Sequence, residues 1–239
     1  MLNKKLSISN AANYLGVSID TLRRWDKSGK LHAKKSPGGH RYYSNLDLNL
    51  YKQDIFALAI EWILGKPKKP KSEFYCPTSI EFKMQLSKLQ SALEKLEALK
   101  NYYPLIVAIA GEIGNNSYDH NLGNWPDISG VFFAFDVNKK QIALADRGLG
   151  ILRTLKRVKP SIKNDEDALY TAFTEILSGR APEARGNGLK FVREVIINNP
   201  LRLDFYSGNA NVIISENNKK IKCSKINVYY GGCLALLTF

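Results

Sequence analysis

Residue types suited to ligand chemistry recur at three places in the second half of the chain. Glu112 and Asn116 lie four residues apart in a helical pattern, so they share one helix face. A carboxylate and an amide in this arrangement can hold a water and a hydrated Mg²⁺. Asp146 directly follows an expected strand at 141–145 and begins a glycine turn, 147–150. Such a turn places a carboxylate where the backbone can approach a ligand closely.

The third place is the start of a helix that is expected to run to Ile197. Its first residues, 185–190, read Arg-Gly-Asn-Gly-Leu-Lys. Glycines at a helix N-terminus expose backbone N–H groups, and the helix dipole is positive there. Both properties favour a phosphate group. The three places together indicate a site for a ligand that carries phosphate.

In this order the three motifs resemble those of the GHKL ATPase family, which includes histidine-kinase catalytic domains, anti-sigma-factor kinases and gyrase. The resemblance covers about residues 80–239 and implies ATP and Mg²⁺ as cofactors. It implies that Asp146 binds the adenine amino group, that Asn116 ligates Mg²⁺, and that Glu112 is the catalytic general base. The other nucleotide-binding residues that it implies are Gly148, Gly150, Arg185, Gly186, Gly188 and Lys190. Residues 151–185 correspond to the ATP lid of the family.

Two features depart from the family pattern. Lys190 stands where the second glycine motif usually has another glycine, so it either contacts phosphate or crowds the helix start. The segment 79–103 contains no histidine. The phosphoacceptor helix of a histidine kinase is therefore not expected.

The elements that would position these residues are expected to form an α/β sandwich. The resemblance implies a mixed sheet that is covered on one face by helices. The expected strands are 131–137, 141–145, 201–206, 212–215, 225–230 and 233–238. A helix at 79–103 carries leucines at positions 86, 89, 93 and 96. This spacing favours packing onto the following domain, and the alternative is a homodimer through the helix.

The N-terminal part has a helix-turn-helix pattern. Apolar spacing and turn residues predict helices at 9–15 and 19–27, and a Pro-Gly-Gly hairpin signal follows at 37–39 between basic flanks. These motifs resemble the MerR-type winged helix-turn-helix over about residues 6–60. In that family the second helix reads the major groove and the wing grips phosphate. By this resemblance the DNA-binding residues are Thr21, Arg23 and Arg24 on the helix and Lys34, Lys35, His40, Arg41 and Tyr42 in the wing.

The distribution of charge agrees with this division of the chain. The 239 residues carry a formal net charge of +13, and residues 1–72 contribute +9 of it from 14 basic and 5 acidic side chains. Such asymmetry indicates that the N-terminal part binds a polyanion, most often nucleic acid. The lysine- and proline-rich segment 66–78 predicts a linker between a DNA-binding domain at 1–65 and an ATP-binding domain at 79–239. The expected fold class of the whole chain is α+β.

Cysteine usage and hydropathy restrict the compartment. The three cysteines are an odd number without C-x-x-C spacing, which indicates a reducing cytoplasm. The apolar runs are much shorter than the roughly 20 residues of a membrane helix, so no membrane partner is expected.

The sequence therefore predicts a transcription regulator that binds double-stranded DNA and whose second domain binds Mg·ATP. ATP binding, with or without hydrolysis, would switch DNA binding or assembly. One alternative is a Ser/Thr kinase that resembles the anti-sigma-factor kinases and acts on a protein partner. The other alternative is a degenerate nucleotide-binding scaffold.

Overall fold

The computed structural model describes residues 5–52, 54–175 and 188–239. The chain divides into two compact units, Met1–Glu61 and Trp62–Phe239. Both units combine helices with an antiparallel sheet, which confirms the α+β class. In the described part of the chain, no helix combines the length and the apolar character that a membrane span requires.

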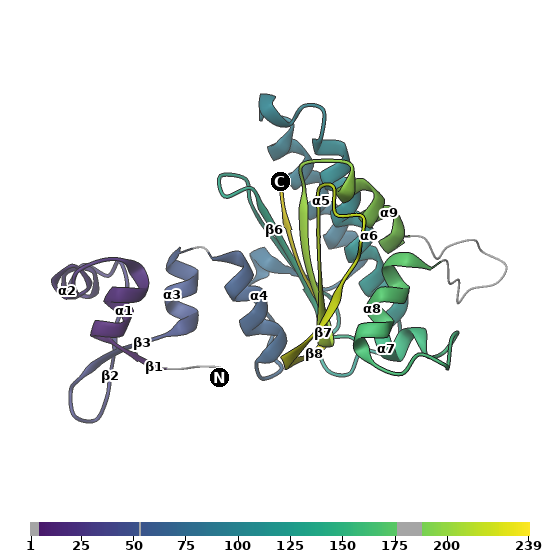
Figure 1. Cartoon of the computed structure of the whole chain (residues 1–239). Helices are drawn as coiled ribbons and strands as arrows, with labels where there is room; N and C mark the ends of the chain where they lie inside the picture. The colour runs from purple at the N-terminus through teal and green to yellow at the C-terminus, as the bar shows by residue number, and fades with distance from the viewer. Residues whose placement is uncertain (1–4, 53, 176–187) are drawn as a thin grey trace. The chain divides into compact units, whose positions relative to one another are not determined.

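The N-terminal unit has a three-stranded sheet with helices packed against it (Figure 1). The strand order is β1 (Lys5–Ser7), β3 (Arg41–Ser44), β2 (Lys34–Lys35), and neighbouring strands are antiparallel. The helices of its core are α1 (Ile8–Leu15), α2 (Ile19–Lys27) and α3 (Asn45–Lys52). A fourth helix, α4 (Ile55–Leu64), spans the boundary between the units. Leu22, Tyr43 and Leu48 are completely buried in the core.

Side-chain and glycine caps explain the helix-turn-helix. Ser18 Oγ accepts a hydrogen bond from the Thr21 backbone N–H, which caps α2 as the sequence predicts. Gly16 has a φ of +68°, a left-handed conformation that ends α1 at low cost for glycine. The cap of α1 is Ser7, so this helix begins one residue earlier than the expected range 9–15.

The C-terminal unit has a five-stranded sheet in the order β4-β5-β6-β8-β7. Its strands are β4 (Tyr75–Cys76), β5 (Val131–Asp136), β6 (Gln141–Asp146), β7 (Arg202–Ser215) and β8 (Cys223–Thr238). All neighbouring strands are antiparallel, so the expected mixed sheet is wrong. The physical reason for two of the pairs is that short connections join β5 to β6 and β7 to β8, and a hairpin reverses the chain direction.

Helices pack on one face of this sheet (Figure 1). They are α5 (Ser79–Leu93), α6 (Tyr103–Asn121), α7 (Gly150–Leu155), α8 (Asp165–Thr174) and α9 (Gly188–Ile197). Between helices and sheet lies an apolar core that includes Phe82, Ile109, Phe173, Val192 and Phe205. The leucines at positions 89 and 93 are buried in this core. The interpretation of the leucine spacing as packing onto the domain is therefore confirmed.

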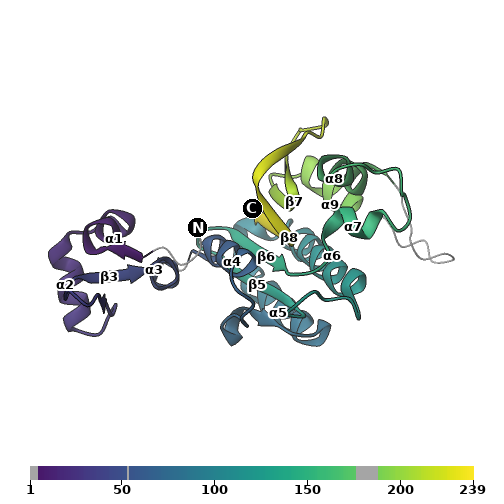
Figure 2. The ribbon, with the colours of Figure 1, turned by 90° about the horizontal axis from the view of Figure 1, so that it is seen from below.

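Several boundaries differ from the expected ones. The predicted helix at 79–103 ends at Leu93, and a 3-10 turn (Glu97–Leu99) precedes α6. Strand β4 lies inside the predicted linker 66–78 and pairs with β5, and a 3-10 turn (Ser72–Phe74) leads into it. The four predicted C-terminal strands are two long strands whose pairing is irregular between Ser207 and Ala210. Figure 2 shows how β7 and β8 extend together as a twisted pair.

Candidate functional site

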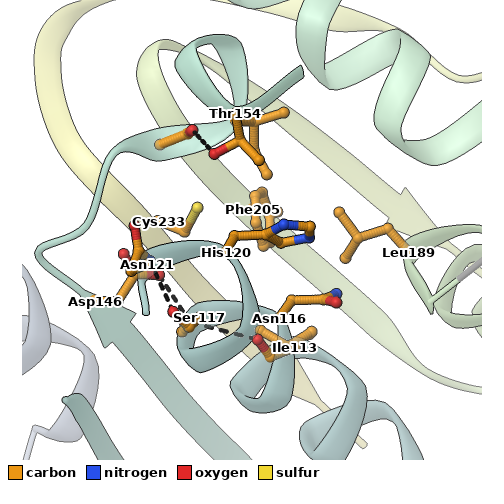
Figure 3. A pocket seen from close by; sticks show the side chains of 12 residues that line it. Ile113, Asn116, Ser117, His120, Asn121, Asp146, Thr154, Leu189, Phe205 and Cys233 are labelled. Atoms are coloured by element: carbon orange, nitrogen blue, oxygen red, sulfur yellow. Dashed lines mark hydrogen bonds between the residues drawn. The ribbon is translucent and has the colours of Figure 1, made fainter. Parts of the chain in front are cut away.

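A pocket in the C-terminal unit is built around Asp146, at the end of β6 (Figure 3). The Asp146 side chain is buried, with 2% of the residue exposed. Its Oδ2 accepts a hydrogen bond from Ser117 Oγ at 2.8 Å, and its Oδ1 accepts one from the Gly148 N–H at 2.8 Å. Burial raises the pKa of Asp146, and these hydrogen bonds oppose the rise. A buried carboxylate in the lining of a pocket is a strong acceptor for a ligand N–H group.

Helix α6 holds the turn that follows Asp146. Asn121 Nδ2 donates to the Ser117 carbonyl at 2.8 Å, and Asn121 Oδ1 accepts from the Leu149 N–H at 2.8 Å. A Cβ atom on Gly148 would overlap the Asn121 side chain, so this position requires glycine. The turn and the helix therefore fit together through a side-chain amide that the sequence analysis did not identify.

Two further glycines border this turn. Gly150 has a φ of +73° and begins α7, and the Ile151 N–H donates to Ser207 Oγ at 3.0 Å. A Cβ atom on Gly232 of β8 would lie 2.5 Å from Asp146 Oδ1 and 2.7 Å from the Gly148 nitrogen. Backbone therefore approaches the Asp146 side chain closely both from the turn after β6 and from β8.

Glu112 and Asn116 lie against the start of α9. A Cβ atom on Gly188 would lie 2.6 Å from Glu112 Oε2 and 3.3 Å from Asn116 Nδ2. Asn116 lines the pocket, and Glu112 lies beside it on the same helix face. Lys190 is half-buried in α9 and is not among the residues that line the pocket. Arg185 and Gly186 lie outside the described residues.

The pocket contains several residues that the sequence analysis missed. These are Ile113, Ser117, His120, Asn121, Ile151, Thr154, Leu189, Phe205 and Cys233. His120 projects from α6 into the pocket (Figure 3). One signal could have found the buried polar pair, because Ser117 and Asn121 continue, at steps of four, the apolar helix face that includes Ile113.

Cys233 lies beside the aspartate. Its Sγ donates a hydrogen bond to Ser207 Oγ at 3.8 Å. Burial and the neighbouring Asp146 carboxylate raise the pKa of the Cys233 thiol well above its ordinary value of 9.0. The thiol is therefore protonated at neutral pH and acts as a weak donor in the pocket.

Metal ligands are sparse in this region. Among the described residues no group of three or more His, Cys, Asp or Glu side chains could hold a metal ion. Mg²⁺ is commonly bound by one or two protein groups together with phosphate oxygens and waters. Asn116 and Glu112 fit Mg²⁺ only in that form, together with the phosphates of a ligand.

In the N-terminal unit, α2 presents the predicted base-contacting residues. Arg23 and Arg24 are exposed and Thr21 is half-buried. Arg24 Nη2 donates to Thr21 Oγ1 at 3.3 Å, and Arg23 forms an exposed ion pair with Asp20 at 2.8 Å. Both of these contacts lie on the exposed surface of α2, so the two guanidinium groups remain accessible to solvent.

The predicted wing is the β2–β3 hairpin. Lys34 pairs with Tyr42 and Lys35 pairs with Arg41 in its register, and His40 is exposed beside the turn. The two lysines are exposed, although Lys34 Nζ lies 3.4 Å from an Asp47 carboxylate oxygen. The hairpin therefore gathers the predicted wing residues on one short element.

Arg41 also joins the predicted wing to α2. Its Nε donates to Asp26 Oδ2 at 2.7 Å, and the Ala33 N–H donates to Asp26 Oδ1 at 2.9 Å. The Arg41 guanidinium and the Ala33 amide lower the pKa of Asp26. Arg41 thus fixes the wing against α2, in addition to its predicted role at DNA.

Comparison with known proteins agrees with the N-terminal geometry. The family described as "MerR family regulatory protein" matches residues 7–43, which form its helix-turn-helix domain here. The chain is also similar to the type II methyltransferase M.Eco47II of Escherichia coli, with 38% identity over 63 residues. That match covers 26% of this chain and 15% of the methyltransferase. The likeness is therefore confined to a small part of the relative.

Proposed function

We propose that this protein is a MerR-type DNA-binding regulator whose C-terminal unit binds Mg·ATP in the pocket around Asp146. The DNA-binding part rests on the family match at residues 7–43. The nucleotide part rests on one observation, the buried Asp146 carboxylate that lines the pocket and is held by Ser117 and Gly148. A buried carboxylate with a raised pKa in a concave site is typical of a functional group.

The proposed adenine contact follows from this carboxylate. Asp146 accepts a hydrogen bond from the exocyclic amino group of adenine, which a purine with a carbonyl at that position cannot donate. Ile113, Ile151 and Phe205 supply apolar surface for the ring. The glycine at position 150, with its positive φ, lets the chain turn from the strand end into α7 at the rim of the pocket.

The proposed phosphate contacts lie at the other end of the pocket. The first turn of α9 begins at Gly188, beside Asn116 and Glu112. Its free N–H groups and the positive end of the helix dipole favour phosphate oxygens. Asn116 contributes an amide oxygen to Mg²⁺, and the metal supplies charge neutralisation of the phosphates when it is bound. In this proposal Glu112 accepts a proton from an attacking hydroxyl group or water.

Calorimetric titration of Mg·ATP and Mg·ADP into the full-length protein tests the pocket. Asp146→Asn should weaken binding by about 1.5–3 kcal/mol, roughly tenfold or more, because a charge-assisted hydrogen bond becomes a neutral one. Asp204→Asn is the matched control, since Asp204 is also buried but pairs with Arg202 and does not line the pocket. Absence of binding to the wild type would reject the nucleotide proposal and leave the scaffold alternative.

The fate of the γ-phosphate separates the two catalytic alternatives. Incubation with γ-labelled ATP and cell lysate should release labelled phosphate if Glu112 activates water. Labelling of a second protein would instead support the Ser/Thr kinase. Glu112→Gln should reduce either product to the level of the lysate alone, while ATP binding at the Asp146 pocket persists, because that pocket does not include the Glu112 carboxylate.

A further inference from the structure

Residues 66–71 read Lys-Pro-Lys-Lys-Pro-Lys, and their backbone is fastened to the C-terminal unit. Trp62 Nε1 donates a hydrogen bond to the Lys68 carbonyl at 2.9 Å. The Phe74 N–H donates to the Lys71 carbonyl at 2.9 Å. We call residues 66–71 the lysine segment. Its backbone is hydrogen-bonded to the Trp62 side chain at its middle, and it ends in the 3-10 turn that leads into β4.

The support beneath the lysine segment is rigid. Arg147 Nη1 donates to the carbonyls of Trp62, Ile63 and Gly65 at 2.6, 3.0 and 3.1 Å. The same guanidinium pairs with Asp127 at 2.6 Å, and only 10% of the Arg147 side chain is exposed. The Trp62 ring packs against the buried Phe132 of β5 with centroids 6.1 Å apart. One arginine therefore fixes the end of α4, from which the lysine segment departs.

The four lysines of the segment are directed to solvent. Lys66, Lys68, Lys69 and Lys71 are all exposed. Lys71 Nζ lies 4.0 Å from a Glu73 oxygen, and within residues 5–52, 54–175 and 188–239 the other three have no ion-pair partner. Four like charges within six residues repel one another, and ordered backbone keeps them together. A polyanion relieves this repulsion.

We propose that the lysine segment is a second contact with DNA phosphates, presented by the C-terminal unit. DNA is the favoured polyanion because the helix-turn-helix of the same chain binds it, which raises the effective concentration of DNA at the segment. Lysine ammonium groups act as point charges on phosphates and do not read bases. The segment therefore adds affinity without adding sequence specificity. This inference rests on the DNA-binding unit and is independent of the nucleotide pocket.

The salt dependence of DNA binding measures the number of phosphate contacts. The full-length protein is titrated with a fluorescent duplex selected from a random pool, and log K is plotted against log salt concentration. Each neutralised phosphate contributes about 0.9 to the slope. Changing all four lysines of the segment to Gln should therefore reduce the slope by roughly 3 to 4, and changing them to Arg should leave it at the wild-type value.

The control is a second set of four exposed lysines in the same unit. This set lies at the turn between β7 and β8 and at the start of β8, and consists of Lys219, Lys220, Lys222 and Lys225. Changing them to Gln lowers the net charge by the same amount. Because these lysines lie outside the proposed contact, the slope of this variant should stay close to that of the wild type. An equal decrease in both variants would show a general charge effect and overturn the proposal. An unchanged slope in the segment variant would overturn it as well. Circular dichroism confirms that each variant is folded.

Discussion

Asp146 illustrates, at the scale of a single residue, a conflict between ligand chemistry and stability. The carboxylate is buried beneath the pocket, and burial raises its pKa above the ordinary value of 3.8. A raised pKa in the folded state means that this group stabilises the fold fully below about pH 3.8, and that the stabilisation is lost as the pH rises through the folded value. At neutral pH the charged form of Asp146 therefore lowers the free energy of unfolding. A role in ligand binding would explain why the chain keeps this destabilising group.

Asp146→Asn should therefore raise the thermal stability at pH 7 while it weakens nucleotide binding. The amide keeps an acceptor for the Gly148 N–H and removes the buried charge. Thermal unfolding followed by circular dichroism should give a melting temperature difference, variant minus wild type, that increases from pH 3.5 to pH 7. The matched variant Asp204→Asn should show no such gain, because Asp204 is paired with Arg202. A variant that is less stable than the wild type at every pH would contradict this explanation.

At the scale of elements, the closeness of β8 to the turn after β6 determines the shape of the pocket. A side chain at Gly232 would collide with the Asp146 backbone oxygen, an atom that cannot move independently of the sheet. At the neighbouring Gly231 a Cβ atom would meet no atom within 4 Å. The two adjacent glycines therefore differ sharply in what they tolerate.

Gly232→Ala should lower the free energy of unfolding of the C-terminal unit by about 1–3 kcal/mol, which is typical of overpacking. It should also reduce Mg·ATP affinity, because Asp146 must shift. Gly231→Ala should change neither property measurably. Denaturant unfolding and calorimetry on both variants check the prediction. Equal stability of the two variants would show that β8 and the turn are not tightly fitted.

Local signals account for the parts of the fold that the sequence predicted well. Helix α2 was predicted from Ile19 to Lys27 because Ser18 is a cap residue, and the structure has these bounds. The predicted helix at 79–103 is longer than the helix in the structure. The leucine spacing continues past Leu93, but the chain leaves the helix there and forms a 3-10 turn. The four predicted C-terminal strands merge because the irregular pairing near Gly208 bends β7 without ending it. Bulges of this kind depend on the partner strand and leave little trace in the sequence.

The sequence predicts only those residues of the candidate site that belong to a motif of a few consecutive or nearby residues. Asp146 and Asn116 belong to local motifs, and the structure places both at one pocket. Asn121 and Cys233 were missed because their roles depend on contacts with the turn after β6 and with β7, far away in the chain. Glu112 and Gly188 come together only through the packing of α6 against α9. Tertiary contacts of this kind cannot be read from spacing.

At the scale of the whole molecule, the proposed function requires that a DNA-binding unit and a nucleotide-binding unit work together in one chain. A regulator of this kind needs two states that bind DNA differently, and ATP must prefer one of them. By linkage, the factor by which ATP changes the DNA affinity equals the factor by which DNA changes the ATP affinity. The coupling between the two units can therefore be measured either as the effect of ATP on DNA affinity or as the effect of DNA on ATP affinity.

The most direct test is the DNA affinity of the full-length protein with and without saturating Mg·ATP at one fixed salt concentration. Fluorescence anisotropy with a duplex selected from a random pool gives both dissociation constants. We expect the two constants to differ at least fivefold, or about 1 kcal/mol, for the wild type, and Asp146→Asn to need roughly tenfold more Mg·ATP for the same change. Equal constants for a wild type that calorimetry shows to be saturated with Mg·ATP would contradict the claim that nucleotide controls DNA binding.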